Sequence, residues 1–242
     1  MSGRVAPQVP RNGVRQLRLF LIDGFAARCL YRSVEFPPCT RRLLACLALA
    51  ERPLSRAYIA GQLWPDIRGD HADACLRSAL WRLRQVGYPL VVASRRELAL
   101  SERVTVDYRE AKALAEQLVS PVSELDLSSI DYRPLCGNLL PEWEEEWLLL
   151  ERESFRQLRL LALESLCTRL SAVGLWAKAI LVGRAAVDGD PLDEMGHQSL
   201  IRAYVAAGDI SQAARQYDAY RHVLQQELDL EPSVSFKELV EV

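Results

Sequence analysis

The chain has 242 residues, half of them hydrophobic and a quarter charged, which is typical of a globular protein and excludes extensive disorder away from the chain ends. Its longest apolar run, at 43–50, is far shorter than the roughly 20 residues that cross a bilayer, and no signal-type segment opens the chain, so we expect a cytoplasmic protein without a membrane partner. The net charge of -2 divides into +8 for residues 1–107, where 17 arginines stand against 9 acidic residues, and -10 for residues 108–242, which suggests that the basic half meets a polyanion.

A small sheet is predicted to follow a loose start. Residues 16–22 alternate as in a strand, Asp23 and Gly24 are a turn signal, and residues 25–36 continue as strand. The prolines that follow end the sheet, and Thr40 is placed to cap a helix over 41–52, whose leucines keep helical spacing.

Two further helices and a hairpin complete the first half. Ser55 is predicted to cap a helix over 56–64, with Leu54 packed at its start and Pro65 at its end, before a loop over 65–73. A third helix, over 72–86, stops before Gly87, which suits a left-handed cap. Two short strands within 89–101 then form a hairpin with Arg95 and Arg96 at its tip. This order of elements is that of a winged helix-turn-helix, which we assign to residues 15–108.

The third helix separates apolar from polar side chains. On a helical wheel at about 100° per residue, one stripe is apolar and the opposite face carries arginine. An exposed helix of this kind fits the major groove of B-DNA, where arginine bonds guanine and neighbouring groups hold phosphates. The apolar stripe contains Leu76, Ala79, Leu80, Leu83 and Val86, and the outer face contains Arg77, Ser78, Trp81, Arg84 and Gln85, with Arg82 at its border.

An ordinary solvated helix surface would show the same pattern, so the helix alone leaves both interpretations open. The hairpin favours DNA binding, because Arg95 and Arg96 lie where a wing reaches an adjacent minor groove. Trp81 either contacts a sugar or a thymine methyl, or folds back on the hairpin and buries its ring.

The second half is predicted to be helical. Helical spacing starts at Trp143, and acidic residues at 142 and 144–146 stand at the start of that helix, where the macrodipole favours them. Residues 119–131 are the least patterned part and are predicted to link the halves.

A period of 34 residues runs through the rest of this half. The period is typical of a tetratricopeptide-like array, with small residues where paired helices approach and Pro191 ending the first unit. An unrelated helical bundle is the alternative. The recurring pairs are Gly174 and Gly208, Ala179 and Ala213, Leu166 and Leu200, and Leu170 and Tyr204.

Several long runs carry a family resemblance. TRRLLACLALAERPLSRAYIAGQLWPD at 40–66 and ADACLRSALWRLRQ at 72–85, with a hairpin ending near VTVDYREAKAL, resemble the amino-terminal half of the SARP family, the Streptomyces antibiotic regulatory proteins. LLPEWEEEWLLLERE at 139–153 and ELDLEPS at 227–233 resemble the bacterial transcriptional activation domain that follows in that family. The expected fold is mainly α with a small β component: an OmpR-type winged helix, then an all-α tetratricopeptide-like domain at 109–242.

The resemblance implies a function as well as a fold. It implies that the third helix recognises DNA, with Arg77, Ser78, Trp81, Arg82 and Arg84 as candidate contacts. It also suggests that Trp64 points toward the phosphate backbone, although a core tryptophan is the alternative. It further implies self-association on promoter direct repeats and recruitment of RNA polymerase, typically at secondary-metabolite genes.

The residues point away from an enzyme. His71, His197 and His222 are far apart, and no nucleophile-elbow, P-loop or HExxH motif occurs. The acidic run at 142–146 points around a helix and cannot converge on one ion. We expect no catalysis, no cofactor and no metal, and the remaining alternative is a protein-interaction scaffold built on the same two domains. The cysteines at 29, 39, 46, 75, 136 and 167 lack a CxxC pair, which predicts buried free thiols.

Overall fold

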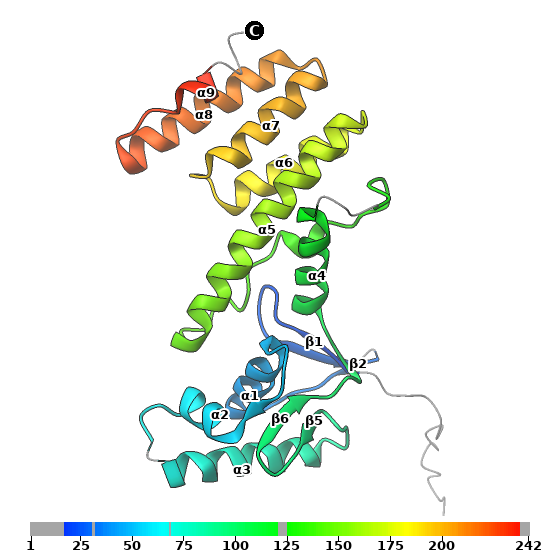
Figure 1. The fold of residues 1–242 in the computed structure, drawn as a ribbon, viewed down its shortest axis with the longest axis vertical. Helices are drawn as coiled ribbons and strands as arrows, with labels where there is room; N and C mark the ends of the chain where they lie inside the picture. Colours follow the sequence, from blue (N-terminus) through cyan, green and yellow to red (C-terminus); the bar gives the residue numbers. More distant parts are fainter. Residues whose placement is uncertain (1–16, 31, 68, 121–124, 238–242) are drawn as a thin grey trace, which may run out of the picture. The chain divides into compact units, whose positions relative to one another are not determined.

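The computed structural model describes residues 17–30, 32–67, 69–120 and 125–237, so the loose start and part of the predicted linker lie outside the described residues. It divides into two compact units. One contains residues 17–20 and 25–106, and the other contains Leu21–Gly24 and the chain from Asp107 onward. The first unit carries the named strands and the second is built of helices, which confirms the predicted fold class (Figure 1). Within the described ranges, no helix is both long and apolar enough to span a membrane.

A four-stranded sheet opens the first unit, with strand order β3-β2-β1-β7. The central strand β1 runs antiparallel to β2 and parallel to β7. Leu30, at φ 56°, turns the chain after β2, so the single strand predicted over 25–36 is in fact a short hairpin. The strands are β1 (Leu17–Phe20), β2 (Ala26–Cys29), β3 (Arg32–Ser33) and β7 (Val104–Val106).

The first helix begins earlier than predicted, and the expected Thr40 cap is wrong. α1 (Pro38–Leu49) follows Pro37, whose extended backbone ends the sheet, and the fixed φ of Pro38 suits a first helical position. Thr40 is fully buried in the first turn, where its N–H donates to the carbonyl of Pro37 at 2.9 Å. The two prolines therefore start the helix upstream of the threonine.

The next two helices follow the prediction closely. Ser55 caps α2 (Arg56–Leu63), because its Oγ accepts the N–H of Tyr58 at 3.1 Å. α3 (Gly69–Gln85) begins at Gly69 rather than at Ala72 and is followed by Gly87 at φ 76°, the predicted left-handed position. Together with α1, these helices bury a leucine-rich core.

A three-stranded sheet completes the unit, in the order β4-β6-β5. β5 (Val91–Ala93) and β6 (Glu97–Leu100) form the predicted hairpin, and β4 (Leu54–Ser55) adds to its edge. In the turn, the N–H of Ser94 donates to the carbonyl of Glu97 at 2.9 Å, and its Oγ accepts the N–H of Glu97 at 2.9 Å. Arg95 and Arg96 therefore lie at the tip, as predicted.

The second unit is a succession of antiparallel helices. The first long helix begins at Glu146 rather than at Trp143, so the acidic residues at 142, 144 and 145 precede the helix. The loop that contains residues 125–132 connects two helices of this same unit, so the prediction that residues 119–131 link the two halves is wrong. The helices are α4 (Asp107–Val119), a 3-10 turn η1 (Arg133–Leu135), α5 (Glu146–Ala172), α6 (Trp176–Gly189), α7 (Glu194–Ala206), α8 (Ile210–Leu228) and α9 (Val234–Lys237).

The period of 34 residues is visible in the helix pairs. Gly174 and Gly208 adopt φ 78° and 79° at the turns before α6 and α8, a left-handed conformation that favours glycine. Ala179 and Ala213 are buried at equivalent places on α6 and α8. The repeat therefore reproduces both the turns and the close helix contacts expected of a tetratricopeptide-like array.

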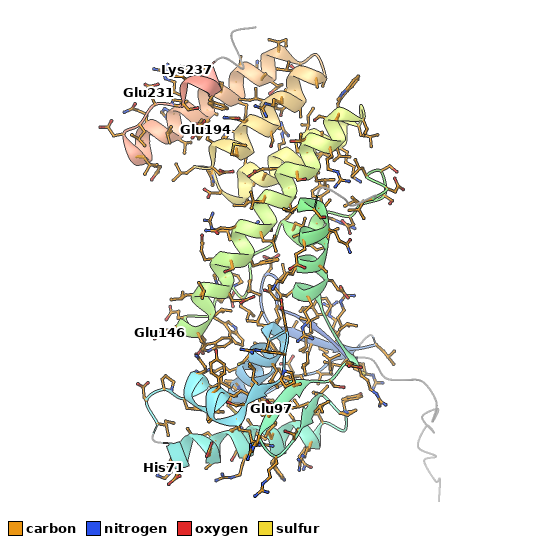
Figure 2. All side chains as sticks on the ribbon, viewed as in Figure 1. His71, Glu97, Glu146, Glu194, Glu231 and Lys237 are labelled. Carbon is orange, nitrogen blue, oxygen red and sulfur yellow. The ribbon has the colours of Figure 1, made fainter. Side chains whose placement is uncertain are left out.

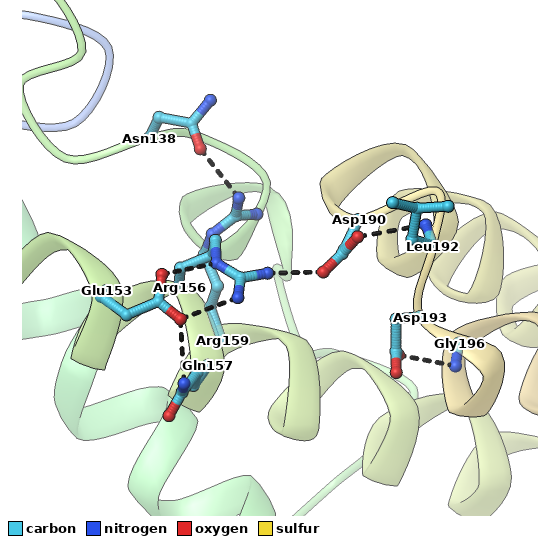
Figure 3. A network of polar contacts seen from close by, with 9 residues as sticks. All are labelled: Asn138, Glu153, Arg156, Gln157, Arg159, Asp190, Leu192, Asp193 and Gly196. Carbon is cyan, nitrogen blue, oxygen red and sulfur yellow. Dashed lines mark hydrogen bonds and ion pairs between the residues drawn. The ribbon is translucent and has the colours of Figure 1, made fainter. Parts of the chain in front are cut away.

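Arginines of α5 hold neighbouring segments of the same unit (Figure 3). Arg159, only 2% exposed, donates to the carbonyl of Leu135 at 3.1 Å and to Oδ1 of Asn138 at 2.8 Å. Arg156 contacts Asp190, which follows α6, at 2.6 Å. These contacts fix the segment before α5 and the end of α6 to one helix face.

The turn between β1 and β2 packs within the second unit. The carboxylate of Asp107 accepts the N–H groups of Leu21 and Ile22 at 2.8 and 3.2 Å. Asp23 and Asn138 exchange two hydrogen bonds, of 2.7 and 2.9 Å. The chain therefore passes from the first unit into the second at this turn, returns, and passes again after β7.

Candidate nucleic-acid interface

Helix α3 presents its polar face to solvent, as its sequence pattern predicts. The stripe residues Leu76, Ala79, Leu80 and Leu83 are buried against the core of the first unit, and Val86 is partly buried. The outer face is exposed along its length and carries Arg77, Ser78, Trp81, Arg82 and Arg84. The backbone of α3 thus orients three arginines away from the core.

Two of these arginines have no internal partner. Neither Arg77 nor Arg84 forms a hydrogen bond or ion pair with any residue that the structure describes. A guanidinium offers five donors in a planar fork, so these side chains are available to an external acceptor such as guanine or phosphate.

The remaining polar groups of α3 are partly engaged. Arg82, at the border of the face, donates to the thiol of Cys39 at 3.7 Å, which leaves its other donors available. The hydroxyl of Ser78 donates to the carbonyl of Ala74 within the helix at 3.0 Å, so it can serve an outside group only as an acceptor while that bond lasts.

The two candidate tryptophans differ in exposure. Trp81 is 62% exposed, so the alternative in which its ring folds back and is buried is wrong. Trp64 stands at the C-cap of α2 and is half-buried. Its surroundings match neither a fully buried core tryptophan nor a free surface one.

The hairpin tip adds a second basic element. Arg95 and Arg96 are exposed in the turn between β5 and β6, beside Glu97, which Figure 2 labels at the start of β6. Their guanidinium groups have no partner among the described residues.

Sequence reasoning missed Arg56, which the fold places between α3 and the hairpin. It is the first residue of α2, and two of its guanidinium nitrogens donate to the carbonyl of Ser94 at 3.3 and 3.0 Å. No local signal marks it, because its partner lies 38 residues further along the chain.

Two shallow grooves connect these residues. The first, of about 680 Å³, follows α3, and the second, of about 590 Å³, lies between α3 and the hairpin. Arg56 and Arg77 line both, and Asp73 is the acidic residue in the second. The result is a continuous basic surface formed by Arg56, Arg77, Arg82, Arg84, Arg95 and Arg96.

The cysteines and histidines are distributed over both units, and Cys75 and His71 lie on α3 itself. All six thiols are free, as predicted, but only Cys29, Cys46 and Cys167 are buried; Cys39 and Cys75 are partly exposed and Cys136 is exposed. His197 is buried, and its ring bonds the carbonyl of Pro191 and the amide of Gln216, so it holds helices together. Burial lowers the pKa of His197.

Comparisons with known proteins bear on both units. Residues 134–241 match the family model of the bacterial transcriptional activator domain. The chain is also similar to the structure of Mycobacterium tuberculosis EmbR in complex with a low-affinity phosphopeptide, with a TM-score of 0.70 and 20% identity over 93% of this chain. This chain spans 64% of the length of that protein. Comparison with curated proteins finds no match.

The domain match and the fold agree with the resemblance found in the sequence. The family model covers the second unit from η1 to α9 but not α4, and the similarity to EmbR extends the shared fold through the winged helix. Residues 134–241 therefore belong to the bacterial transcriptional activator domain family, and the chain shares with EmbR a fold in which a winged helix precedes the helical array.

Proposed function

We propose that the chain binds promoter DNA through a domain formed by residues 15–108 and activates transcription through residues 109–242. The exposed arginine face of α3, continuous with the hairpin arginines, carries this proposal. A helix of this kind docks in the major groove while a basic wing reaches the neighbouring backbone or minor groove.

The residues divide into two tasks. Arg77, Arg82 and Arg84 read base edges, with Ser78 and Trp81 beside them, and each bidentate arginine–guanine pair contributes about 1–3 kcal/mol of discrimination. Arg95 and Arg96 hold phosphates, which supplies affinity independent of sequence. Trp64, at the C-cap of α2, points toward the phosphate backbone of the DNA.

The helical array serves partners other than DNA. We assign to it the contact with RNA polymerase and with a second copy bound to an adjacent repeat, in the cytoplasm. Its acidic balance disfavours direct contact with DNA, because phosphates repel carboxylates. Transcription in vitro with purified polymerase, with and without the protein on the same promoter, measures this activity.

DNA binding is tested by fluorescence anisotropy on DNA from the region upstream of its own gene and on scrambled DNA. We expect preference for the native sequence and a steep loss of affinity between about 50 and 200 mM salt. Arg82→Ala and Arg84→Ala are expected to reduce that preference without lowering the melting temperature, since both side chains lie outside the core.

Arg52→Ala is the matched control, because Arg52 is exposed and has no partner among the described residues. It removes the same charge from outside the basic surface and is expected to keep the sequence preference. Absence of binding even at low salt would overturn the proposal and favour a protein-interaction scaffold.

A further inference from the structure

Arg56 connects the first turn of α2 to the tip of the hairpin. Its Nε and Nη2 donate to the carbonyl oxygen of Ser94 at 3.3 and 3.0 Å, and its backbone N–H donates to the carbonyl of Arg96 at 2.9 Å. A single residue thus bonds both sides of Arg95.

Buried Leu98 and Leu100 hold the body of the hairpin in the core, whereas its tip has few other attachments among the described residues. β4 contributes only Leu54 and Ser55 to the edge of the hairpin, and the turn is otherwise closed by bonds of Ser94 to residues of the turn itself. β4 pairs with Leu98 and Glu97, directly after the tip, but a two-residue pairing is marginal by itself in water. Arg56 is therefore the group that reaches the tip.

We infer that Arg56 is a positioning residue that holds the hairpin tip against α2, and thereby sets where Arg95 and Arg96 meet the DNA backbone. The inference rests on the proposed DNA binding. The side chain has to be arginine, because a planar fork places two donors on one carbonyl while its stem stays along α2. A lysine at this position would keep the charge but lose the paired donors.

Direct contact between Arg56 and a phosphate is the competing explanation, since Arg56 lines both grooves. The dependence of affinity on salt separates the two. Each phosphate contact contributes about 0.9 to the slope of log affinity against log salt. The double variant Arg95→Ala/Arg96→Ala is therefore expected to lower that slope by about 1.8.

A positioning role predicts that Arg56→Ala alone lowers the slope by about 1.8, and that adding it to the double variant changes nothing further. Arg56→Lys is expected to restore little of the lost slope, because lysine lacks the paired donors. A direct contact instead predicts a fall of about 0.9 that adds to the double variant, with recovery in Arg56→Lys, and that result overturns the inference.

A measurement without DNA makes the result independent of the proposed function. Trypsin cleaves after Arg95 and Arg96, and it requires a tip that opens locally. We expect cleavage at these sites to be about tenfold faster in Arg56→Ala, since a hydrogen bond from a charged donor is lost. Arg52→Ala is the control, with cleavage at the wild-type rate.

The outcomes distinguish failure of the proposed DNA binding from failure of the positioning role of Arg56. If the wild type does not bind DNA but the tip of Arg56→Ala is cleaved faster, the proposed function fails while the attachment of the tip stands. If the wild type binds DNA and cleavage is unchanged in Arg56→Ala, the positioning role is wrong. Circular dichroism on each variant verifies that α2 is intact.

Discussion

Glu164 on α5 shows how packing in the array changes the chemistry of a single side chain. Burial, a hydrogen bond with Asp193 and the charge of that neighbour raise the pKa of Glu164 to about 8. Asp193 is itself held in place, because its carboxylate accepts the N–H of Gly196 at 2.9 Å at the start of α7 (Figure 3). Near neutral pH the folded protein therefore keeps Glu164 protonated.

This pKa makes stability depend on pH in a defined direction. The pKa is about 8 in the folded state and near 4.5 in the unfolded state. The contribution of Glu164 to the free energy of unfolding is therefore most favourable below about pH 4.5. It falls as pH rises toward 8, because the unfolded state then loses the proton that the folded state keeps. Glu164→Gln, which keeps a donor toward Asp193, is expected to raise the free energy of unfolding by about 2 kcal/mol at pH 8.5.

That figure is well below the full linkage value, because Glu164 is half exposed and solvent screens it. Urea denaturation at pH 4.5 and 8.5 measures the difference, which should vanish at the lower pH. Glu142→Gln, at an exposed position before α5, is the control and should change neither value. Equal stabilisation at both pH values would show that ionisation of Glu164 is not the cause.

At the scale of elements, the described turn of α9, Val234–Lys237, is anchored by an aromatic contact. It is held by Phe236, which is fully buried and lies edge-on to Tyr220 with ring centroids 5.0 Å apart. Tyr217 packs on the same ring. Phe236 therefore attaches the described part of α9 to α8.

Phe236→Ala is expected to lower the free energy of unfolding by about 3 kcal/mol, in the range for removal of a buried aromatic side chain. Chemical denaturation followed by circular dichroism measures the loss. Val234→Ala changes the same helix at a position 74% exposed and should stay within about 0.5 kcal/mol of wild type. Similar losses in both variants would indicate that helix propensity, rather than the ring contact, holds α9.

Elements with strong local patterns are the ones that the sequence predicts. α3 follows from its apolar stripe, the cap of α2 from Ser55, and the hairpin with its arginine tip from the alternation around it. The sequence predicts the start of α3 three residues too late, since Gly69 and Asp70 carry no apolar signal. α4 was missed because two of its buried positions are alanines and no turn residue separates it from β7.

Other features depend on partners far along the chain and leave no local trace. β4 exists only because Leu54 pairs with Leu98. The role of Arg56 also leaves no local trace in the sequence, since its bond to Ser94 depends on how the hairpin folds back. The candidate recognition residues were predictable from one helix, whereas the residue that holds the wing required the fold.

At the scale of the whole molecule, the boundary between the units is crossed more than once. Leu21–Gly24 belongs to the second unit although the strands on both sides belong to the first. The backbone N–H of Leu140 donates to the carbonyl of Leu21 at 2.9 Å, in addition to the bonds of Asp107 and Asn138. The helical unit is thus completed by a distant piece of sequence.

A fragment of residues 107–242 lacks that piece. We expect its helical unit to be less stable than in the full chain by about 3 kcal/mol, because several hydrogen bonds of about 0.5–1.5 kcal/mol each are lost. Urea denaturation followed by the fluorescence of Trp143, Trp147 and Trp176 reports on this unit. Trp64→Phe/Trp81→Phe in the full chain removes the remaining tryptophan signals and makes the comparison direct. Equal midpoints would mean that the turn contributes nothing to the unit.

The interleaved turn limits how such proteins can be recombined. A chimera that joins this winged helix to another regulator's activator domain at residue 107 would place a foreign surface against Leu21–Gly24. A working chimera would need residues 21–24 from the same protein as its activator domain. These four residues would have to be replaced inside the winged helix, in addition to the junction at residue 107. A change in the turn at 21–24 therefore has to be matched by a change in the segment at 137–140, although both segments belong to the second unit and lie more than 100 residues apart in the sequence.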